Sequence, residues 1–582
     1  MNIFKKRIIS VISAMAMLAT SAITVPMTVG AESERYEFEN GTLVGATVET
    51  TESGYSGSGY VYITSAGQTA SITANVPSAG MYEVVVSYSL PASMGSSKIQ
   101  NILINGVNQG QMAFTPNDGF TEKSLGMYKL GQGDNTITIE SSWGWTMFDY
   151  ATVKSATLPE LKTSNTLVNA KATDRTQALM NYLADTYGNN IISGQQEIYG
   201  GGNNGDYELE FEWIKNLSGE YPAIRGFDFN TYNPLFSWDA GTTDRIVEWV
   251  NDRNGIATSS WHITVPKDMS AYTVGQTMDW TMATYVPSET NFNTANVLVE
   301  GTKENDFYKL SVEELAKQLQ ILSDNDVPLL FRPFHEAEGN GGLNGEGAWF
   351  WWASAGAEVY KELWIDLYTT LTEDYNFNNL IWEYNSYTYE TSSAWYPGDN
   401  YVDIVGYDKY NATNWSTGTT APNESAISGT FYNLVNMFDG KKMVAMTEND
   451  TIPTIENLTV EKAGWLYFCP WYGEHLLDSK YNNPETVKEV YMSDYTINLD
   501  DLPENLYSYG LDGPVVKVIL GDVNCDNTVN AFDVSLLLKS LITDYELSEQ
   551  GALNADVDKD GSVKIADVIM IKKYLVGAID KF

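Results

Sequence analysis

The sequence has few positive charges and few cysteines for its length. Its 582 residues hold 34 Lys and Arg against 75 Asp and Glu, a formal net charge of −41. So large an excess of negative charge repels phosphate backbones, and we therefore expect no binding of nucleic acid. The same acidity favours calcium. The two cysteines, Cys469 and Cys525, lie far apart in the chain, which excludes a framework of disulfides.

Long apolar runs are equally scarce. The one clear run, 8–22, follows the basic residues Lys5, Lys6 and Arg7 and is short for a membrane span. Small residues at 29–31 provide a cleavage site, so residues 1–31 are predicted to be a signal peptide. The alternative is an uncleaved anchor. We expect a mature chain that begins at Glu32, is secreted and has no membrane segment.

The length predicts three or four domains rather than one core. Short β-type runs separated by Gly, Ser and Asn turns predict a β-sandwich over residues 32–156, followed by a polar linker at 157–168. Its predicted strands are Ala70–Ala74, Met81–Tyr88, Asn101–Ile104, Asn135–Glu140 and Phe148–Val153.

Residues 169–500 alternate strands with amphipathic helical stretches, the pattern of a (β/α)₈ TIM barrel. A doubly wound open sheet is the alternative, but the sequence has no glycine-rich phosphate loop. A linker at 501–517 and a small α-helical domain at 518–582 follow. The predicted barrel strands are Ile191–Gln195, Ala223–Phe227, Ile256–Trp261, Val327–Phe334, Leu380–Tyr384, Val402–Tyr407, Met443–Thr447 and Gly464–Phe468.

Two predicted strands end in glutamates that face one mouth in such a barrel. The fourth strand runs into Arg332-Pro-Phe-His-Glu336, and the seventh ends at Glu448. Two carboxyl groups at the carboxyl ends of barrel strands are the equipment of a retaining glycosidase. Aromatic residues make up 13% of the chain, which suits a protein that packs rings on sugar faces. A retaining glycosidase uses one of its two carboxylates as the nucleophile, and we expect Arg332 to hydrogen-bond near that carboxylate and to lower the pKa of the carboxyl group.

The His335-Glu336 pair and the tryptophans that follow it resemble the acid/base strand of glycoside hydrolase family 26, best known for β-mannanases. The resemblance implies a double displacement with Glu336 as acid/base and Glu448 as nucleophile. It also implies that His262 and His335 hydrogen-bond the sugar at the cleaved bond. The further residues it places at the substrate are Arg332, Trp349, Asp408, Tyr410 and Trp471.

Several neighbouring residues compete for these roles. Glu338 lies two residues beyond the expected acid, and Glu383 ends the fifth predicted strand. Tyr407 is an alternative to Tyr410 as the partner of the nucleophile. For Trp351 and Trp352 we favour packing over contact with substrate.

The sandwich resembles carbohydrate-binding module family 35 in its first strand, Tyr36–Gly41, and its last, Trp143–Tyr150. That resemblance implies a structural calcium held by Glu37, Glu39 and Asp149. Alternating glutamates share one face of a strand, and unpaired carboxylates on one face need a cation. The alternative is solvent-facing acids. The expected sugar platform consists of Trp143, Trp145 and Tyr60, with burial in the core as the alternative for the tryptophans.

The tail holds a duplication, because Asp522–Asp533 and Asp556–Asp567 align without gaps. Each is a 12-residue calcium loop that runs into a helix, at Val534–Leu541 or Val568–Leu575. Paired loops of this kind resemble a dockerin, which implies two Ca²⁺ ions and a cohesin partner on a scaffoldin. Expected cohesin contacts are Ala531, Phe532, Ile565 and Ala566. Expected ligands are Asp522, Asn524, Asp526, Thr528, Asn530 and Asp533, then Asp556, Asp558, Asp560, Ser562 and Asp567.

Together these patterns predict a secreted, cellulosomal endo-β-1,4-mannanase that needs no cofactor for catalysis and has a monomeric catalytic unit. A β-1,3-1,4-glucanase or a xylanase on the same barrel remains open, because the sequence does not fix which sugar is bound. A non-catalytic carbohydrate-binding protein anchored to a scaffoldin is the alternative of another class.

Overall fold

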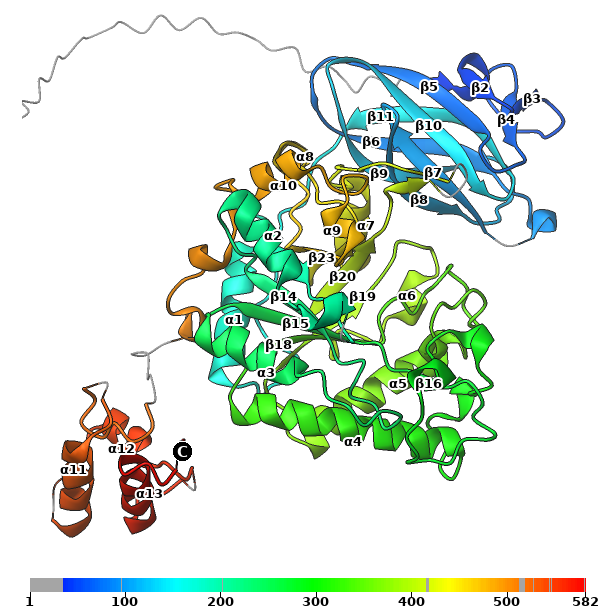
Figure 1. Cartoon of the computed structure of the whole chain (residues 1–582). Coiled ribbons are helices and arrows are strands. Elements are labelled where there is room, and N and C mark those ends of the chain that lie inside the picture. The colour runs from blue at the N-terminus through cyan, green and yellow to red at the C-terminus, as the bar shows by residue number, and fades with distance from the viewer. Residues whose placement is uncertain are drawn as a thin grey trace, which may run out of the picture.

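The computed structural model describes residues 35–582 apart from 96, 201, 415–417, 512–518, 527, 544, 546, 560 and 580. The expected signal peptide, residues 1–31, lies outside the described residues. Figure 1 shows a sandwich, a barrel and a small helical region along the chain. Within the described part of the chain, every helix is too short or too polar to cross a membrane.

The N-terminal part is a β-sandwich of two antiparallel sheets. One sheet has the order β3-β4-β11-β6-β9, with β1 paired to β11, and the other has the order β2-β5-β10-β7-β8. Their bounds are β1 Arg35–Glu37, β2 Thr42–Val44, β3 Thr47–Glu49, β4 Tyr60–Ile63, β5 Thr69–Val76, β6 Gly80–Ser89, β7 Lys98–Ile104, β8 Val107–Phe114, β9 Thr121–Leu130, β10 Gly133–Trp143 and β11 Thr146–Ser155.

Alternation along each strand decides which residues enter the sandwich core. In β5 the buried residues alternate with polar ones, as expected when one face of a sheet is solvated. The apolar faces of both sheets meet around Phe114, Ile137 and Phe148. The five strands predicted from the sequence fall within β5, β6, β7, β10 and β11.

The central part is the predicted barrel, an eight-stranded parallel sheet with the order β13-β14-β15-β18-β19-β20-β23-β24. Ile192 and Tyr467 form a parallel bridge where the first and last strands meet, so the barrel is nearly closed. Strand bounds are β13 Gly194–Gln196, β14 Ile224–Asp228, β15 Ile256–Trp261, β18 Leu329–Pro333, β19 Leu380–Asn385, β20 Ile404–Lys409, β23 Met443–Asn449 and β24 Phe468–Pro470.

Helices surround this barrel (Figure 1). Their bounds are α1 Asp174–Thr186, α2 Leu209–Ser218, α3 Thr242–Val247, α4 Lys303–Asp324, α5 Ala357–Thr369, α6 Ser392–Trp395, α7 Ser428–Met437, α8 Ile455–Glu461, α9 Glu474–Leu477 and α10 Pro484–Tyr491. Two-stranded additions are β12 Ile191–Ile192 with β25 Thr496–Ile497, β16 Val265–Pro266 with β17 Ala283–Thr284, and β21 Thr413–Asn414 with β22 Thr419–Thr420.

The first and last predicted barrel strands were placed too early in the sequence. Ile191 and Ile192 form β12, which pairs with β25 outside the barrel sheet. The final strand begins at Phe468 rather than Gly464. Both predictions followed apolar, buried residues that precede the strands themselves, such as Ile191, Ile192, Trp465 and Leu466.

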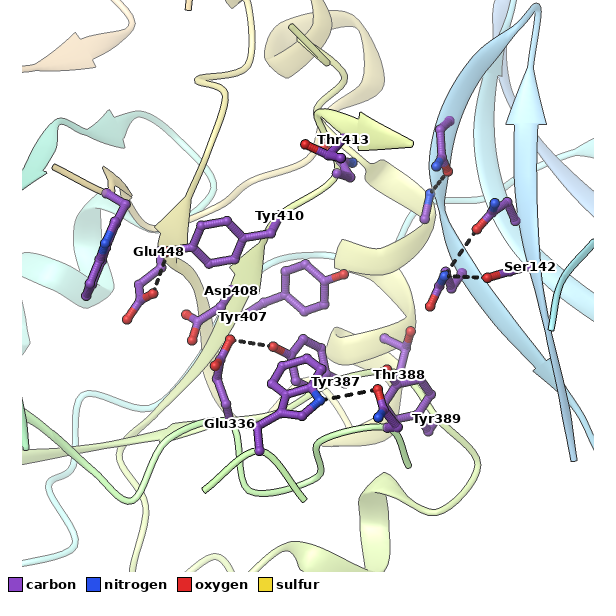
Figure 2. A pocket seen from close by; sticks show the side chains of 18 of the residues that line it. Ser142, Glu336, Tyr387, Thr388, Tyr389, Tyr407, Asp408, Tyr410, Thr413 and Glu448 are labelled. Carbon is purple, nitrogen blue, oxygen red and sulfur yellow. Dashed lines mark hydrogen bonds between the residues drawn. The ribbon is translucent and has the colours of Figure 1, made fainter. Parts of the chain in front are cut away.

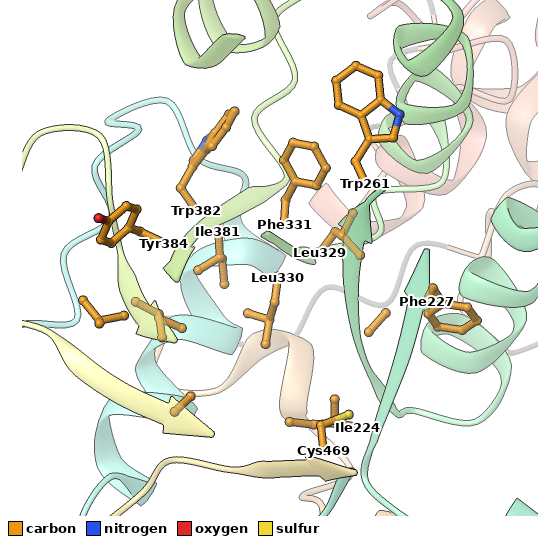
Figure 3. Packing of buried hydrophobic residues seen from close by; sticks show 14 of the residues in the cluster. Ile224, Phe227, Trp261, Leu329, Leu330, Phe331, Ile381, Trp382, Tyr384 and Cys469 are labelled. Carbon is orange, nitrogen blue, oxygen red and sulfur yellow. The ribbon is translucent and has the colours of Figure 1, made fainter. Parts of the chain in front are cut away.

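β18 and β19 are buried at every position, and apolar residues begin both strands, as expected for strands covered on both faces. Trp382 of β19 lies against Trp364 and Tyr368 of α5, with ring centroids 5.9 Å and 5.0 Å away. Figure 3 shows Trp382 beside Phe331 of β18 in this layer. Alternation then turns Arg332 toward the barrel interior, where its guanidinium reaches β20 and β23.

The C-terminal region holds α11 Ala531–Ile542, α12 Glu549–Ala555 and α13 Ile565–Leu575 around a small core. The helices α11 and α13 begin three residues earlier than the sequence predicted. Asp533 and Asp567, the last residues of the two loops, are buried in the first helical turns. Each accepts a hydrogen bond from the backbone of the preceding N-cap residue, so the loop end itself starts the helix.

The sandwich packs directly against the barrel. Strand β9 lies along α7, where Gly429 approaches so closely that an added Cβ would stand 2.5 Å from the Tyr128 ring. The ion pair between Lys123 and Glu390, 2.6 Å long, also crosses this interface. The two domains therefore present one continuous surface at the barrel mouth.

Candidate active site

A cleft of about 780 Å³ opens at the carboxyl ends of the barrel strands (Figure 2). It brings together seven residues that the sequence singled out. These are His262, Glu336, Trp349, Asp408, Tyr410, Glu448 and Trp471. Arg332 and His335 are buried beside the cleft, where both lie near Glu448.

Glu336 lies in the turn that follows β18. Its backbone is left-handed, with φ of 53°, a conformation that costs free energy for a residue with a side chain. Asn385, at the end of β19, accepts the Glu336 N–H at 2.9 Å and holds this turn in place. The Tyr387 hydroxyl donates to Glu336 Oε1 at 2.7 Å. The carboxyl group is thus fixed by its neighbours from the adjacent strand.

Burial raises the pKa of Glu336 well above its usual value, and the negative charges of Asp408 and Glu448 raise it further. The hydrogen bond from Tyr387 acts in the opposite direction. The net effect favours a protonated carboxyl group in the free protein. Such a group can donate a proton.

Glu448 lies near the end of β23, where two side chains donate hydrogen bonds to its carboxylate. Arg332 Nη2 donates to Oε1, and the Tyr410 hydroxyl donates to Oε2 at 2.7 Å. Arg332 Nη1 donates to Asp408 Oδ2 at 3.0 Å, so one guanidinium bridges two carboxylates. Tyr407 instead packs its ring against Tyr387, 5.5 Å away between centroids. Tyr410 rather than Tyr407 therefore contacts Glu448.

The histidines form a buried chain beside Glu448. Asp228 Oδ2 contacts His262 Nδ1, His262 Nε2 lies 3.0 Å from His335 Nε2, and His335 Nε2 lies 3.9 Å from Glu448 Oε1. Burial alone would lower the pKa of His262, but the Asp228 carboxylate outweighs it and raises that pKa. Burial and the charges of His262 and Arg332 lower the pKa of His335, so His335 is neutral.

Aromatic rings line the cleft in two groups. Trp471 lies beside Tyr199, with their ring centroids 6.1 Å apart. Trp349 is 38% exposed, and its ring meets Tyr387 at 5.9 Å. Trp351 and Trp352 are buried, as predicted, and serve packing.

The competing glutamates lie outside the cleft. Glu383 is buried inside the barrel and accepts from Tyr467 and Thr258. Glu338 is buried under the mouth and accepts from Ser386 and from the Tyr387 N–H at 3.0 Å. Glu338 thereby fixes the segment that carries the Tyr387 side chain.

The residues that line the cleft but were not singled out from the sequence include Tyr199, Tyr387 and Tyr472. Asp228, which contacts His262 beside the cleft, was not singled out either. Asp228 ends a barrel strand, the same signal that identified Glu448, so it was within reach of the sequence. The tyrosines belong to segments after strand ends, and with 37 tyrosines in the chain no local pattern distinguishes them.

In the sandwich, Glu37, Glu39 and Asp149 gather around one loop. Ser56 donates to Glu37 at 2.8 Å through its hydroxyl and to Asp149 at 2.9 Å through its N–H. Among the described residues, Glu39 Oε2 is buried without a hydrogen-bond partner. Burial raises the pKa of Glu37 and of Asp149, and the neighbouring negative charges raise both further. These carboxylates fit a hard cation that would offset their repulsion.

The expected sugar platform is only partly present. Trp143 and Trp145 are 55% and 43% exposed, and Lys98 Nζ lies 4.6 Å and 5.4 Å from their ring centroids. Tyr60 is 1% exposed because its ring packs against Tyr55 and Phe120. A buried ring offers no face to a polymer, so the prediction for Tyr60 was wrong.

Both C-terminal loops converge on their last aspartate. In the first loop, Asp533 accepts from the N–H groups of Asn524 and Asn530. In the second, ligand oxygens of Asp556, Asp558 and Asp567 all lie within 4.8 Å of one another. Oxygen donors so close together fit calcium. Asp560 lies outside the described residues.

The four expected cohesin-contact residues share one property, which is exposure at the start of a helix. Phe532 is 76% exposed on α11 and Ile565 is 59% exposed on α13. Ala531 and Ala566 are exposed beside them. Phe532 is residue 11 of the first loop and Ile565 is residue 10 of the second, so each repeat leaves one large apolar side chain in solvent at the start of its helix. Such exposed apolar side chains are typical of an interaction surface.

Comparison with known proteins gives three family matches. Residues 168–501 match the model of glycosyl hydrolase family 26, residues 34–156 match carbohydrate binding module family 35, and residues 520–576 match the dockerin type I domain. Dockerin type I domains bind calcium and pair with cohesins.

Individual relatives agree with the family matches. A mannan endo-1,4-beta-mannosidase of Thermothelomyces thermophilus is 31% identical over 80% of this chain and 90% of its own. The crystal structure of a ruminal GH26 endo-beta-1,4-mannanase is 47% identical, with a TM-score of 0.67 over 81% of this chain and 99% of that one. A Podospora anserina GH26-CBM35 beta-(1,4)-mannanase structure is 29% identical, with a TM-score of 0.53 over 82% and 99%.

The buried Glu338 predicts a pH dependence of stability. Burial raises the pKa of Glu338 to about 7, above the 4.5 of an unfolded glutamate. The folded state then binds more protons than the unfolded state between these values, so this residue's contribution to stability falls as pH rises from about 4.5 to about 7. Glu338→Gln removes that dependence. The melting temperature of the variant minus that of the parent should therefore be larger at pH 8 than at pH 4. A difference that is the same at every pH would contradict this.

Proposed function

The chain belongs to glycosyl hydrolase family 26, and on that basis we propose that it is an endo-β-1,4-mannanase that cleaves internal bonds of mannan, glucomannan and galactomannan. The observation that carries the proposal is the pair Glu336 and Glu448. They lie in one cleft, with environments that hold one carboxyl group protonated and surround the other with donors. Family 26 enzymes are retaining glycoside hydrolases.

Glu448 is the proposed nucleophile. Arg332 and Tyr410 donate to its two oxygens, which stabilises the ionised form and orients it toward the sugar. Attack on the anomeric carbon forms a glycosyl-enzyme ester with inverted configuration. His262 lines the cleft beside the proposed sugar site, and the buried His335 lies between the His262 ring and the carboxylate.

Glu336 is the proposed acid/base. Protonated at first, it donates to the leaving glycosidic oxygen, so that the departing sugar leaves as a neutral alcohol. The ionised Glu336 then removes a proton from water, which attacks the ester and restores the original configuration. Loss of the Glu448 charge in the ester removes one of the causes of the raised Glu336 pKa, which favours the ionised carboxylate that must accept the proton from water.

Aromatic rings supply the proposed sugar contacts. Trp471 stacks under the sugar whose bond is cleaved, and Trp349 borders the leaving-group side next to Glu336. Asp408 accepts from Arg332 and Thr447 and holds the guanidinium in place, while it lines the cleft. A β-1,3-1,4-glucanase or xylanase would use the same machinery and differ only in which hydroxyls are recognised.

The accessory domains carry the proposals on metal and location. We propose two Ca²⁺ ions in the dockerin and one at Glu37, Glu39 and Asp149 of the sandwich. Trp143 and Trp145 form the proposed polysaccharide-binding surface of the sandwich. The enzyme is proposed to be secreted by means of residues 1–31. It then joins a scaffoldin through Ala531, Phe532, Ile565 and Ala566, and its catalytic unit acts as a monomer.

Substitution of either carboxylate tests the proposal. Glu336→Ala and Glu448→Ala should each lower hydrolysis of β-mannan by roughly a thousandfold or more, because each removes a group that bonds to reacting atoms. Reducing-sugar release on β-mannan, mixed-linkage glucan and xylan measures this. Glu358→Ala, an exposed acid of α5, is the matched control.

Azide distinguishes the acid/base residue from the nucleophile. In the acid/base variant azide should rescue turnover with a retained β-azide product, whereas the nucleophile variant should yield the α-azide. Release of reducing sugar by the parent from mixed-linkage glucan or xylan alone would show that mannan is not the substrate. No release from any of the three polymers would favour the non-catalytic alternative.

Tyr387 predicts a shift in the pH profile. Its hydrogen bond stabilises the ionised form of Glu336 and so holds that pKa below the value burial alone would set. In Tyr387→Phe the pKa of Glu336 rises, and we expect the alkaline limb of kcat/KM to move to higher pH. Tyr389→Phe, a neighbouring ring in the same cleft, is the control. An unmoved limb, or a move to lower pH, would contradict the role of Tyr387.

Calcium content tests the metal proposal. Elemental analysis of the parent should give three bound Ca²⁺ ions per chain, and chelation should lower the melting temperature of the sandwich and unfold the dockerin. Glu39→Gln should leave two ions and a sandwich that no longer responds to chelator. Glu52→Gln, an exposed acid nearby, should leave three. Two ions in the parent would overturn the sandwich site.

A further inference from the structure

The cleft does not end at the barrel. Five of its lining residues belong to the sandwich: Asn101, Asn108, Gly110, Gln111 and Ser142. They come from β7, β8 and β10. Figure 2 shows Ser142 on the sandwich, across the cleft from Thr388 and Tyr389 of the barrel.

Hydrogen bonds fix this edge of the sandwich to the barrel. Asn423 Nδ2 donates to the Asn108 carbonyl at 2.8 Å, and Ser425 Oγ donates to Gln109 Oε1 at 2.8 Å. Together with the close contact at Gly429, they hold β8 beside the barrel loop that precedes α7. The sandwich wall of the cleft is therefore positioned as firmly as the barrel wall.

The side chains on this wall form a polar network. Gln111 Nε2 donates to Asn101 Oδ1 at 3.2 Å and to Ser142 Oγ at 3.1 Å, while Asn101 Nδ2 donates to Glu140 Oε1 at 2.9 Å. Amide, hydroxyl and carboxylate groups held in fixed positions can exchange hydrogen bonds with sugar hydroxyls. The network lies on the outer face of the sheet, where side chains alternate with the buried core.

The arrangement of the cleft tells which part of a polymer reaches this wall. In Figure 2, Tyr387, Thr388 and Tyr389 lie between Glu336 and Ser142 of the sandwich, and Glu448 lies farther from the sandwich than Glu336. Trp349 packs against Tyr387, and Trp471 packs against Tyr199. In the mechanism above, Glu336 protonates the leaving oxygen. The sugars beyond that oxygen therefore extend toward the sandwich.

We propose that Asn101, Gln111 and Ser142 form a distal subsite for sugar units on the leaving-group side of the cleaved bond, so that the sandwich takes part directly in the active-site cleft. This inference rests on the proposed function. It assigns the sandwich a role at the reacting chain itself, separate from its exposed Trp143 and Trp145. Only substrates with several sugars on the leaving side reach the subsite.

The length of the oligosaccharide substrate is the variable that tests the proposed subsite. The double variant Asn101→Ala/Gln111→Ala should lower kcat/KM for mannohexaose and for galactomannan about fivefold to tenfold, the effect of losing one or two hydrogen bonds. For mannotetraose we expect less than a twofold change. With mannohexaose labelled by ¹⁸O at the reducing end, cleavage should shift toward shorter leaving fragments.

Two further variants keep the test decisive. Thr73→Ala/Thr136→Ala changes paired polar residues on the same sheet face, outside the cleft, and should behave as the parent. Gly429→Val places a side chain against Tyr128, displaces the sandwich from the barrel and should reproduce the chain-length effect. Its displacement is measured as an increased radius of gyration in X-ray scattering.

The outcomes separate the two proposals. In one outcome the parent is active, and the Asn101→Ala/Gln111→Ala variant has the same kcat/KM as the parent for every oligosaccharide length and the same cleavage pattern. That result overturns the subsite alone. A parent inactive on every oligosaccharide and polymer overturns the proposed function and the subsite with it. Loss of the same proportion on mannotetraose and mannohexaose would also overturn the subsite, because it would show general damage to the fold.

Discussion

The active site depends on one buried cation, the guanidinium of Arg332. It leaves β18 toward the barrel interior and donates to Asp408 on β20 and to Glu448 on β23, so it ties together three strands that are far apart in the sequence. A buried charge without partners would be very costly, and so would two buried carboxylates without a cation. Each of the three groups is tolerated inside the barrel because the other two are present.

The surroundings of this triad distinguish the two proposed catalytic carboxyl groups. Glu448 accepts from the guanidinium and from the Tyr410 hydroxyl. Among the described residues, the Glu336 carboxyl group accepts from Tyr387, and burial together with the negative charges of Asp408 and Glu448 raises its pKa. Two chemically identical side chains thereby lie in different environments, as acid–base and nucleophilic chemistry on one sugar requires.

The same balance of negative charge and cation recurs in the accessory domains. Carboxylates converge at Glu37, Glu39 and Asp149 in the sandwich and at Asp556, Asp558 and Asp567 in the dockerin. Oxygen donors of this kind fit calcium, which dockerin type I domains bind and which is the proposed cation of the sandwich cluster. The β7–β8 edge of the sandwich also lines the cleft at the barrel mouth.

The sequence by itself determined the three-domain order, the barrel and the strand ends that carry Glu336 and Glu448, because hydrophobic period and strand-end motifs are local. Through motifs that resemble known families, it also singled out seven of the residues that line the cleft, among them Glu336, Glu448 and Trp471. Only the tertiary structure decided that Tyr60 is buried, that Tyr387 donates to Glu336, and that Asn101 and Gln111 face the barrel mouth. These facts depend on contacts between residues far apart in the chain. The left-handed turn at Glu336 likewise persists because Asn385 on the next strand holds it, and no local sequence encodes that support.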